Sequence, residues 1–168
     1  MAIRPILHLP DPRLREVAIP VTEFDDALQC LIDDMFETMY DAKGVGLAAP
    51  QIGVGLRLSV IDTVGDKSQQ LVLINPEIID AVGKETYQEG CLSVPGVYEK
   101  VERAHQVTVR ALDRAGQPFE MTSDGLLGEC FQHEIDHLNG QLFIDLLSPL
   151  KRAFARRKFD KLKRRNAK

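Results

Sequence analysis

Residues 131–140 read FQHEIDHLNG, in which two histidines stand four residues apart and a glutamate follows the first. Residues four apart lie above one another on one face of an α-helix, so a helix here would bring both imidazole rings together. His133 and His137 can then hold one cation between them, and Glu134 is placed to accept a proton from water on that cation. A polar helix face gives the same short pattern without a metal, so the rest of the chain must decide between the two interpretations.

The residues after this motif do not complete a zinc-peptidase site. Metallopeptidases with the same motif add either a histidine six residues after the second one or a glutamate from a later helix. Here Phe143 stands at the histidine position, and Asp145 and Asp160 are the only acids after the motif. A third ligand must therefore come from elsewhere in the chain.

The three cysteines are the alternative source. Cys130 lies about 7 Å along the helix axis from a cation held between the histidines, too far for a thiolate bond of about 2.3 Å, and is expected to line the site. Cys30 falls within an amphipathic segment and is expected to be buried. Cys91 lies in QEGCLSVPG (88–96), whose glycine and proline residues indicate an irregular, tightly turned stretch. We predict Cys91 as the third ligand.

Hydrophobic periodicity predicts helices at both ends of the chain with short strands between them. The expected helices cover 25–42, 124–139 and a segment starting at Ser148, and strand-like runs cover 56–62, 70–75, 105–112 and 118–122. A glycine-rich segment, residues 44–55, lacks the Gly-Lys-Ser/Thr of a phosphate loop. The order of elements predicts an α+β fold, with short antiparallel strands around a central HExxH helix, in which residues 1–147 form a single domain.

Charge is segregated along the chain. Residues 151–168 contain ten Lys or Arg and one acid, a net charge of +9, whereas residues 1–150 carry a net −13. We predict that residues 148–168 form a basic C-terminal helix that projects from the body, with Leu150, Ala153 and Phe154 packing its start. The N-terminus lacks the apolar run of a signal peptide, and no stretch is long enough to span a bilayer. Three cysteines without framework spacing fit a reducing cytoplasm, so we expect a cytoplasmic protein with no membrane partner.

Three segments resemble, in order and spacing, the motifs of the peptide deformylase family: GVGLAAPQIG (44–53), EGCLSVPG (89–96) and QHEIDHLNG (132–140). The resemblance extends from DPRLR (11–15) to the helix beginning at SPLKR (148–152). It implies a metal-dependent hydrolase that removes the N-formyl group from the formylmethionine of newly made polypeptides and releases formate. The implied metal ligands are Cys91, His133 and His137, with water in the fourth position.

The resemblance also implies the roles of other residues. Glu134 would act as general base and then general acid, while the side-chain amide of Gln51 and the backbone N–H of Leu92 would stabilise the oxyanion. Gly46 would offer backbone polar groups to the extended peptide. The methionine side chain would lie among Val45, Leu126 and Cys130.

Two further polar residues near the motifs have expected structural roles, and one position departs from the family pattern. Glu89 would hold the loop of Cys91 through a hydrogen bond, and Asp136 would form an ion pair and bind no metal. Tyr98 stands where well-known members have an arginine that helps to bind the peptide, which puts contacts beyond the methionine in question.

The resemblance implies Fe²⁺ as the native metal, one ion per chain, with zinc or nickel as substitutes, although a thiolate and two imidazoles suit zinc as well. It also implies docking on the ribosome through the basic tail, since family members are thought to bind there by this extension. Two alternatives remain open: a peptidase using the same HExxH chemistry, and a non-catalytic metal-binding module whose basic tail docks on a partner.

Overall fold

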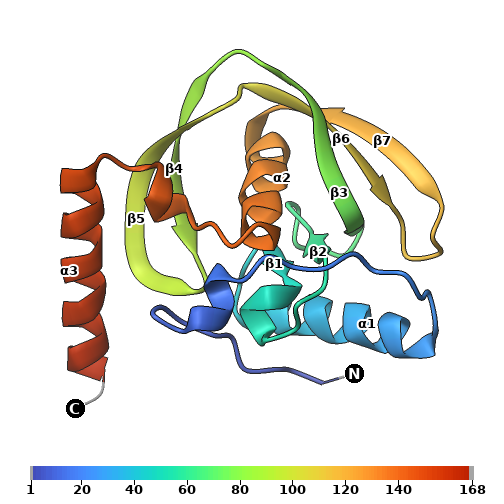
Figure 1. Ribbon diagram of the computed structural model, residues 1–168, viewed down its shortest axis with the longest axis horizontal. Helices are drawn as coiled ribbons and strands as arrows, with labels where there is room; N and C mark the ends of the chain where they lie inside the picture. The colour runs from blue at the N-terminus through green and yellow to red at the C-terminus, as the bar shows by residue number, and fades with distance from the viewer. Residues whose placement is uncertain (1, 167–168) are drawn as a thin grey trace.

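The computed structural model describes residues 2–166 and has the predicted α+β architecture. Its central element is helix α2 (Gly125–Leu138), which carries the HExxH motif. In Figure 1, α2 stands between two parts of the molecule. One is a hairpin of β4 (Glu85–Cys91) and β5 (Val94–Arg103), and the other is a larger sheet that includes β3 (Leu71–Val82), β6 (Gln106–Leu112) and β7 (Pro118–Ser123). The larger sheet packs against apolar residues of α2, including Phe131 and Ile135, whereas the hairpin brings side chains to its polar face.

The larger sheet is antiparallel throughout and has the strand order β1-β2-β3-β6-β7. The strands are β1 (Gly46–Ala48), β2 (Leu58–Ile61), β3 (Leu71–Val82), β6 (Gln106–Leu112) and β7 (Pro118–Ser123). All were anticipated except β1, and β3 continues seven residues beyond the predicted run. Because β1 is at the edge of the sheet, one side of its backbone is free of strand pairing.

The β4–β5 hairpin, by contrast, was not predicted as strands. β4 (Glu85–Cys91) pairs with β5 (Val94–Arg103), and the register shifts between Glu89 and Cys91. The expected irregular turn around Cys91 is therefore a hairpin tip, reached by two long strands. Every second residue of β4 turns toward the body, but the buried one, Glu89, is charged, and β5 likewise buries Arg103. Because some inward positions are charged, the sequences of β4 and β5 lack the regular apolar alternation by which a strand is recognised.

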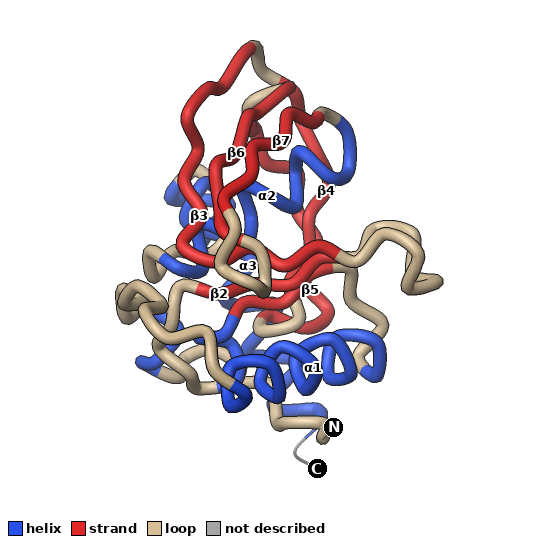
Figure 2. The backbone as a smooth tube through the Cα atoms, turned by 90° about the vertical axis from the view of Figure 1, so that its right-hand side faces the viewer, coloured by secondary structure: helices blue, strands red, loops and turns tan. Residues whose placement is uncertain are grey.

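Helix α1 (Asp26–Asp41) begins after its N-cap Asp25, whose side chain accepts a hydrogen bond from Leu28 N, and it buries an apolar stripe that includes Ile32, Met35 and Met39. This stripe packs on β1 and β2 to form one core cluster. Figure 2 shows α1 lying across one end of the molecule. Cys30 was expected to be buried, but it lies on the outer face of α1 and is exposed.

The C-terminal helix α3 (Pro149–Asn166) forms as predicted, but its packing differs from the prediction. It lies alongside β5 and so does not project freely (Figure 1). Leu150 and Phe154 are 67% and 54% exposed and Ala153 is exposed too, whereas Ala155 and Phe159 are buried with the valines of β5. The helix has two apolar pairs with four-residue spacing, Leu150 with Phe154 and Ala155 with Phe159, and β5 packs against the second pair.

Two short 3₁₀ turns frame the site region, η1 (Pro12–Arg15) and η2 (Ala49–Ile52), and a third, η3 (Phe143–Leu146), leads into α3. Among the described residues, no helix is both long and apolar enough to cross a membrane.

Candidate metal centre

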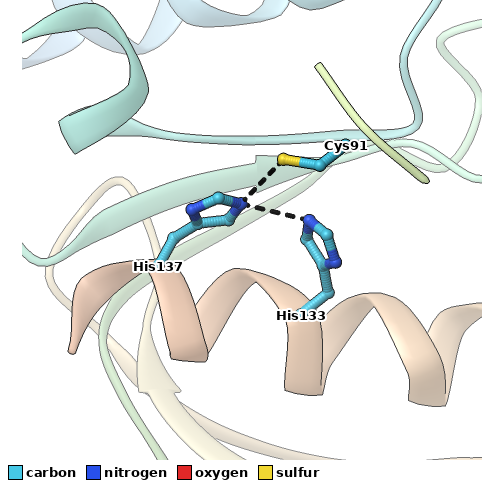
Figure 3. A group of neighbouring side chains, drawn as sticks. All are labelled: Cys91, His133 and His137. Atoms are coloured by element: carbon cyan, nitrogen blue, oxygen red, sulfur yellow. Dashed lines mark hydrogen bonds between the residues drawn. The ribbon is translucent and has the colours of Figure 1, made fainter. Parts of the chain in front are cut away.

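Helix α2 presents His133 and His137 on one face. Their ring nitrogens Nε2 lie 3.1 Å apart, and Figure 3 shows both rings rising from the helix toward the same point. The helix ends at Leu138, followed by Gly140 with φ +74°, so His137 lies in the last turn. Helical spacing thus places the pair as predicted.

The side chain of Cys91 meets these histidines from the tip of the β4–β5 hairpin. Its Sγ lies 3.3 Å from His137 Nε2, and the three possible ligand atoms all lie within 4.8 Å of one another. Ligands arranged tetrahedrally about a shared cation at about 2.0–2.3 Å would lie roughly 3.3–3.7 Å apart. The separations of His137 Nε2 from His133 Nε2 and from Cys91 Sγ, 3.1 and 3.3 Å, are close to this range.

The chemistry of this cluster fits a cation. Two ring nitrogens and a sulfur face one another, and all three carry lone pairs in the forms that bind metals, a neutral imidazole and a thiolate. His137 Nδ1 is buried and has no hydrogen-bond partner among residues 2–166. Burial, followed by the positive charge of His133, lowers the pKa of His137 well below its usual value. The neutral ring that results is the form in which histidine binds a metal.

A buried ion-pair network holds His133 in place. Glu89 Oε1 lies 2.8 Å from His133 Nδ1, and the same carboxylate forms a bidentate ion pair with Arg103. Arg103 Nη1 in turn donates to Asp136 Oδ2 at 2.9 Å, which confirms Asp136 as an ion-pairing residue. Burial raises the pKa of Glu89, but its hydrogen bonds with Arg103 and His133 outweigh this effect. The net result is a pKa below the usual value, so the carboxylate stays ionised.

This network adds to the role expected for Glu89. Two residues before Cys91, its carboxylate ties β4 to α2 through His133 and to β5 through Arg103, and it also orients the ring of His133. Arg103 was not predicted as part of the site, because a single arginine in a charged stretch gives no sign of burial. The one available signal was its partner: a buried carboxylate beside a metal ligand needs a compensating cation.

Glu134 lies deep beside the cluster and is 3% exposed. A Cβ added to Gly46 would lie 2.5 Å from Glu134 Oε1, so only glycine lets β1 pass this close to the carboxylate. Glu134 Oε2 has no hydrogen-bond partner among the described residues. Burial raises the pKa of Glu134 to about 7, and the charge of His133 opposes the rise.

Gln51 reaches the same place from η2. Its Oε1 accepts from Ala48 N at 2.9 Å, and its Nε2 donates to Ser93 Oγ at 3.0 Å and faces Cys91 Sγ at 3.6 Å. The amide is therefore fixed with its donor end toward the sulfur. Leu92 follows Cys91 at the hairpin tip and lines the same cavity.

A cavity of about 400 Å³ opens at the surface beside this cluster, and its lining includes Gln51, Cys91, Leu92, His133 and Glu134. All four residues expected to contact substrate are in its wall: Val45, Gly46, Leu126 and Cys130. Cys130 is buried, and burial followed by the charge of Glu134 raises the pKa of its thiol, so it serves as an apolar wall. Tyr98 lines the rim and is 60% exposed. Its ring lies against Gly90, where an added Cβ would stand 2.5 Å from Tyr98 Cε1.

Comparison with known proteins gives a consistent result. The family model described as polypeptide deformylase matches residues 3–153. A peptide deformylase of Alkalilimnicola ehrlichii is 59% identical over 165 residues, covering 98% of this chain and 93% of that protein. The crystal structure of a peptide deformylase from Legionella pneumophila has a TM-score of 0.97 at 67% identity and covers 99% of both chains. A peptide deformylase from Synechococcus elongatus in complex with actinonin has a TM-score of 0.90 at 44% identity, covering 95% of this chain and 88% of that one.

Proposed function

Because the chain belongs to the polypeptide deformylase family, we propose residue roles that account for the family's activity. The protein is a metal-dependent hydrolase that removes the N-formyl group from nascent peptides. The observation that carries the proposal is the convergence of Cys91, His133 and His137 beside the buried carboxylate of Glu134, at the floor of an open cavity. A purely structural metal site would need neither that carboxylate nor the cavity.

Cys91, His133 and His137 would hold the cation. When bound, the cation supplies Lewis-acid chemistry, which lowers the pKa of water and polarises a carbonyl. Glu134 accepts the proton of the water that attacks the formyl carbon and then gives it to the leaving amine, whose departure releases formate and the free methionine terminus. Its position on α2, one residue from a ligand, supports this role.

Gln51 and Leu92 are the proposed donors to the oxyanion that develops on the formyl oxygen. Gln51 Nε2 has two hydrogens, and only the contact with Ser93 has a short donor–acceptor distance. The second hydrogen is then free to leave the weak contact with Cys91 Sγ for the oxyanion. The backbone N–H of Leu92 follows the ligand Cys91 directly, which supports its role as the second donor.

The substrate backbone is proposed to pair with the free edge of β1 at Gly46. This would direct the methionine side chain into the slot formed by Val45, Leu126 and Cys130, three residues that meet in the cavity wall. A flexible thioether suits such an apolar slot.

The experiment that tests the function is incubation of the anaerobically prepared iron protein with formyl-Met-Ala-Ser. We expect stoichiometric release of formate and Met-Ala-Ser. Release of free amino acids without formate would instead support a peptidase that uses the same motif.

Fe²⁺ is the proposed native ion, and a cytoplasmic site of action is proposed with it, since thiolate ligation of ferrous iron requires a reducing environment. Activity of the iron form should decay in air while the nickel form persists, because nickel(II) resists the oxidation that affects ferrous iron. Equal lifetimes in air would count against iron.

The basic helix α3 is proposed to tether the enzyme, through residues 151–168, to ribosomal RNA, with the catalytic domain within residues 1–147. Arg157, Lys161 and Arg164 form one outward stripe at helical spacing and are exposed. Replacing all three by Gln should weaken salt-sensitive co-sedimentation with ribosomes and leave turnover of a short formyl-peptide nearly unchanged. This variant keeps the contacts of Ala155 and Phe159 that deletion of 151–168 would remove.

The matched control neutralises Lys67, Lys84 and Lys100, three exposed cations of the body. If both triple variants lost co-sedimentation equally, overall charge would be responsible and the tether would be rejected.

A further inference from the structure

Ser93 is a fully buried residue at the tip of the β4–β5 hairpin, two residues after Cys91. It lies in the turn between the two strands, directly after Leu92. Its Oγ accepts a hydrogen bond of 3.0 Å from Gln51 Nε2. No step of the proposed reaction uses this hydroxyl, and Ser93 is not among the residues that line the cavity. Any influence of the hydroxyl on the reaction must therefore pass through the Gln51 amide.

Two contacts at opposite ends fix how the Gln51 amide is turned. Its Oε1 accepts from Ala48 N at 2.9 Å, and its Nε2 donates to Ser93 Oγ. The terminal torsion of a glutamine has no sharp preference of its own, so these contacts decide the orientation of the planar group. Once Ser93 takes one hydrogen of Nε2, the direction of the other is set. That side of the amide faces the proposed metal centre, where Cys91 Sγ lies 3.6 Å from Nε2.

The backbones that carry these two side chains are both tied to one short N-terminal segment. Leu7 N donates to Gln51 O at 2.7 Å, and Leu9 N donates to Ser93 O at 3.0 Å. The segment thus bridges η2 and the hairpin tip, although Gln51 and Ser93 are 42 residues apart in the chain. Because main-chain hydrogen bonds hold both residues, their side-chain contact belongs to a fixed unit and is not a passing approach of two mobile groups.

On the basis of the proposed deformylase function, we propose that Ser93 is a positioning residue that orients the Gln51 amide toward the oxyanion. With the hydroxyl of Ser93 as acceptor for one hydrogen, Gln51 keeps the other for the negative charge that develops on the formyl oxygen. Without that hydroxyl, a buried N–H loses its partner, which is unfavourable. The amide then turns toward the sulfur of Cys91, the acceptor already beside it, and its donor is lost to the oxyanion.

The test compares Ser93→Ala with the wild type, both as the anaerobically prepared iron protein, with formyl-Met-Ala-Ser as substrate. We expect kcat to fall by about tenfold, less than the roughly 10²–10³-fold that loss of a whole oxyanion donor causes. KM and metal content should stay close to the wild-type values, because the negative charge on the formyl oxygen develops only in the transition state. A general loosening of the site would instead raise KM or reduce the metal content, and either result with kcat unchanged would overturn the proposal.

The same substitution in a Gln51→Ala background gives the sharper comparison. If Ser93 acts through Gln51, Ser93→Ala should lower kcat by less than about twofold once the amide is absent, so the two effects are not additive. An equal loss of kcat in both backgrounds would contradict the proposal, because Ser93 would then act independently of Gln51. Wild-type turnover in Gln51→Ala would overturn it as well, together with the donor role of Gln51.

Ser59→Ala is the matched control, because Ser59 is a second serine that is fully buried. It lies on β2, outside the cavity, and its Oγ has no hydrogen-bond partner among residues 2–166. Its removal should leave kcat at the wild-type value. If both serine variants lost kcat equally, loss of any buried hydroxyl would be sufficient and the proposal would be rejected. These outcomes are distinct from failure of the proposed function, in which the wild type itself would release no formate.

Discussion

Strand β4 forms two glutamate–histidine contacts four residues apart, and they have very different surroundings. Glu89 contacts His133 at the inner end of the hairpin, where its side chain is 2% exposed, and Glu85 contacts His105 near the outer end, where its side chain is 43% exposed. The distances are similar, 2.8 and 2.6 Å. What differs is the set of further partners: Arg103 and Asp136 enclose the inner pair, whereas the outer pair is half-exposed and has the hydroxyl of Tyr87, which donates to Glu85 at 3.0 Å.

This comparison teaches that a pair of residue types does not by itself indicate a functional site. Burial makes the inner pair costly to form and to break, so it can fix the orientation of a metal ligand. The outer pair is screened by water and contributes little. The proposed metal centre is at the inner end, where Cys91 terminates the same strand.

The largest effect is expected from Cys91→Ala, which removes a proposed ligand from the inner end of β4. Metal affinity should fall by more than the roughly 10–100-fold that loss of an outer partner causes, and formate release should fall with it. The check is metal content per chain after dialysis, measured beside turnover. Full metal retention with unchanged affinity would exclude Cys91 as a ligand.

A smaller effect on the metal is expected from Glu89→Gln, which leaves His133 in place but removes the charge that orients it. Metal affinity should fall by about 10–100-fold. Arg103 would also lose its bidentate partner inside the protein, so thermal stability should fall as well.

The twin variant Glu85→Gln sharpens the comparison, because it changes the same residue type on the same strand. Metal affinity should be unchanged, as His105 lies outside the site. Equal losses of metal affinity in the two variants would show that the difference in burial has no functional consequence.

The smallest effect on turnover is expected from substitutions in α3, which covers β5 on the opposite face of the hairpin. Their effect is on stability. Phe159→Ala removes a ring that is 5% exposed and should destabilise the protein by about 3 kcal/mol, whereas Phe154→Ala, at a 54% exposed position, should have little effect. For a chain of this size the first change should lower Tm by roughly 6–12 °C. An unchanged Tm in both variants would mean that α3 does not unfold together with the body.

The parts of this molecule that the sequence predicted are those whose signal is local. Helical spacing brings His133 and His137 together, and alternating apolar residues mark strands such as β6. In both cases a few neighbouring residues carried enough information. Cys91 was chosen differently, by elimination: Cys130 was excluded by reach and Cys30 by an expected burial that the structure does not show.

The parts that it missed depend on contacts distant in the chain. The inward face of β5 includes Arg103, which is tolerable only because its guanidinium pairs with Glu89 of β4 and with Asp136 of α2, 33 residues later. The buried stripe on α3 is likewise chosen by β5: Phe154 and Phe159 are equally apolar, and only the partner surface decides between them. Long-range pairing of this kind has no local signature.

The most direct test of the account concerns Glu134, which is proposed to move protons and not to bind the metal. Metal content and formate release from formyl-Met-Ala-Ser should be measured in parallel for the wild type and Glu134→Gln, both prepared anaerobically. The account predicts wild-type metal content with turnover lower by about 10²–10⁴-fold, the usual contribution of a positioned general base. Turnover close to that of the wild type, or loss of the metal together with activity, would contradict it.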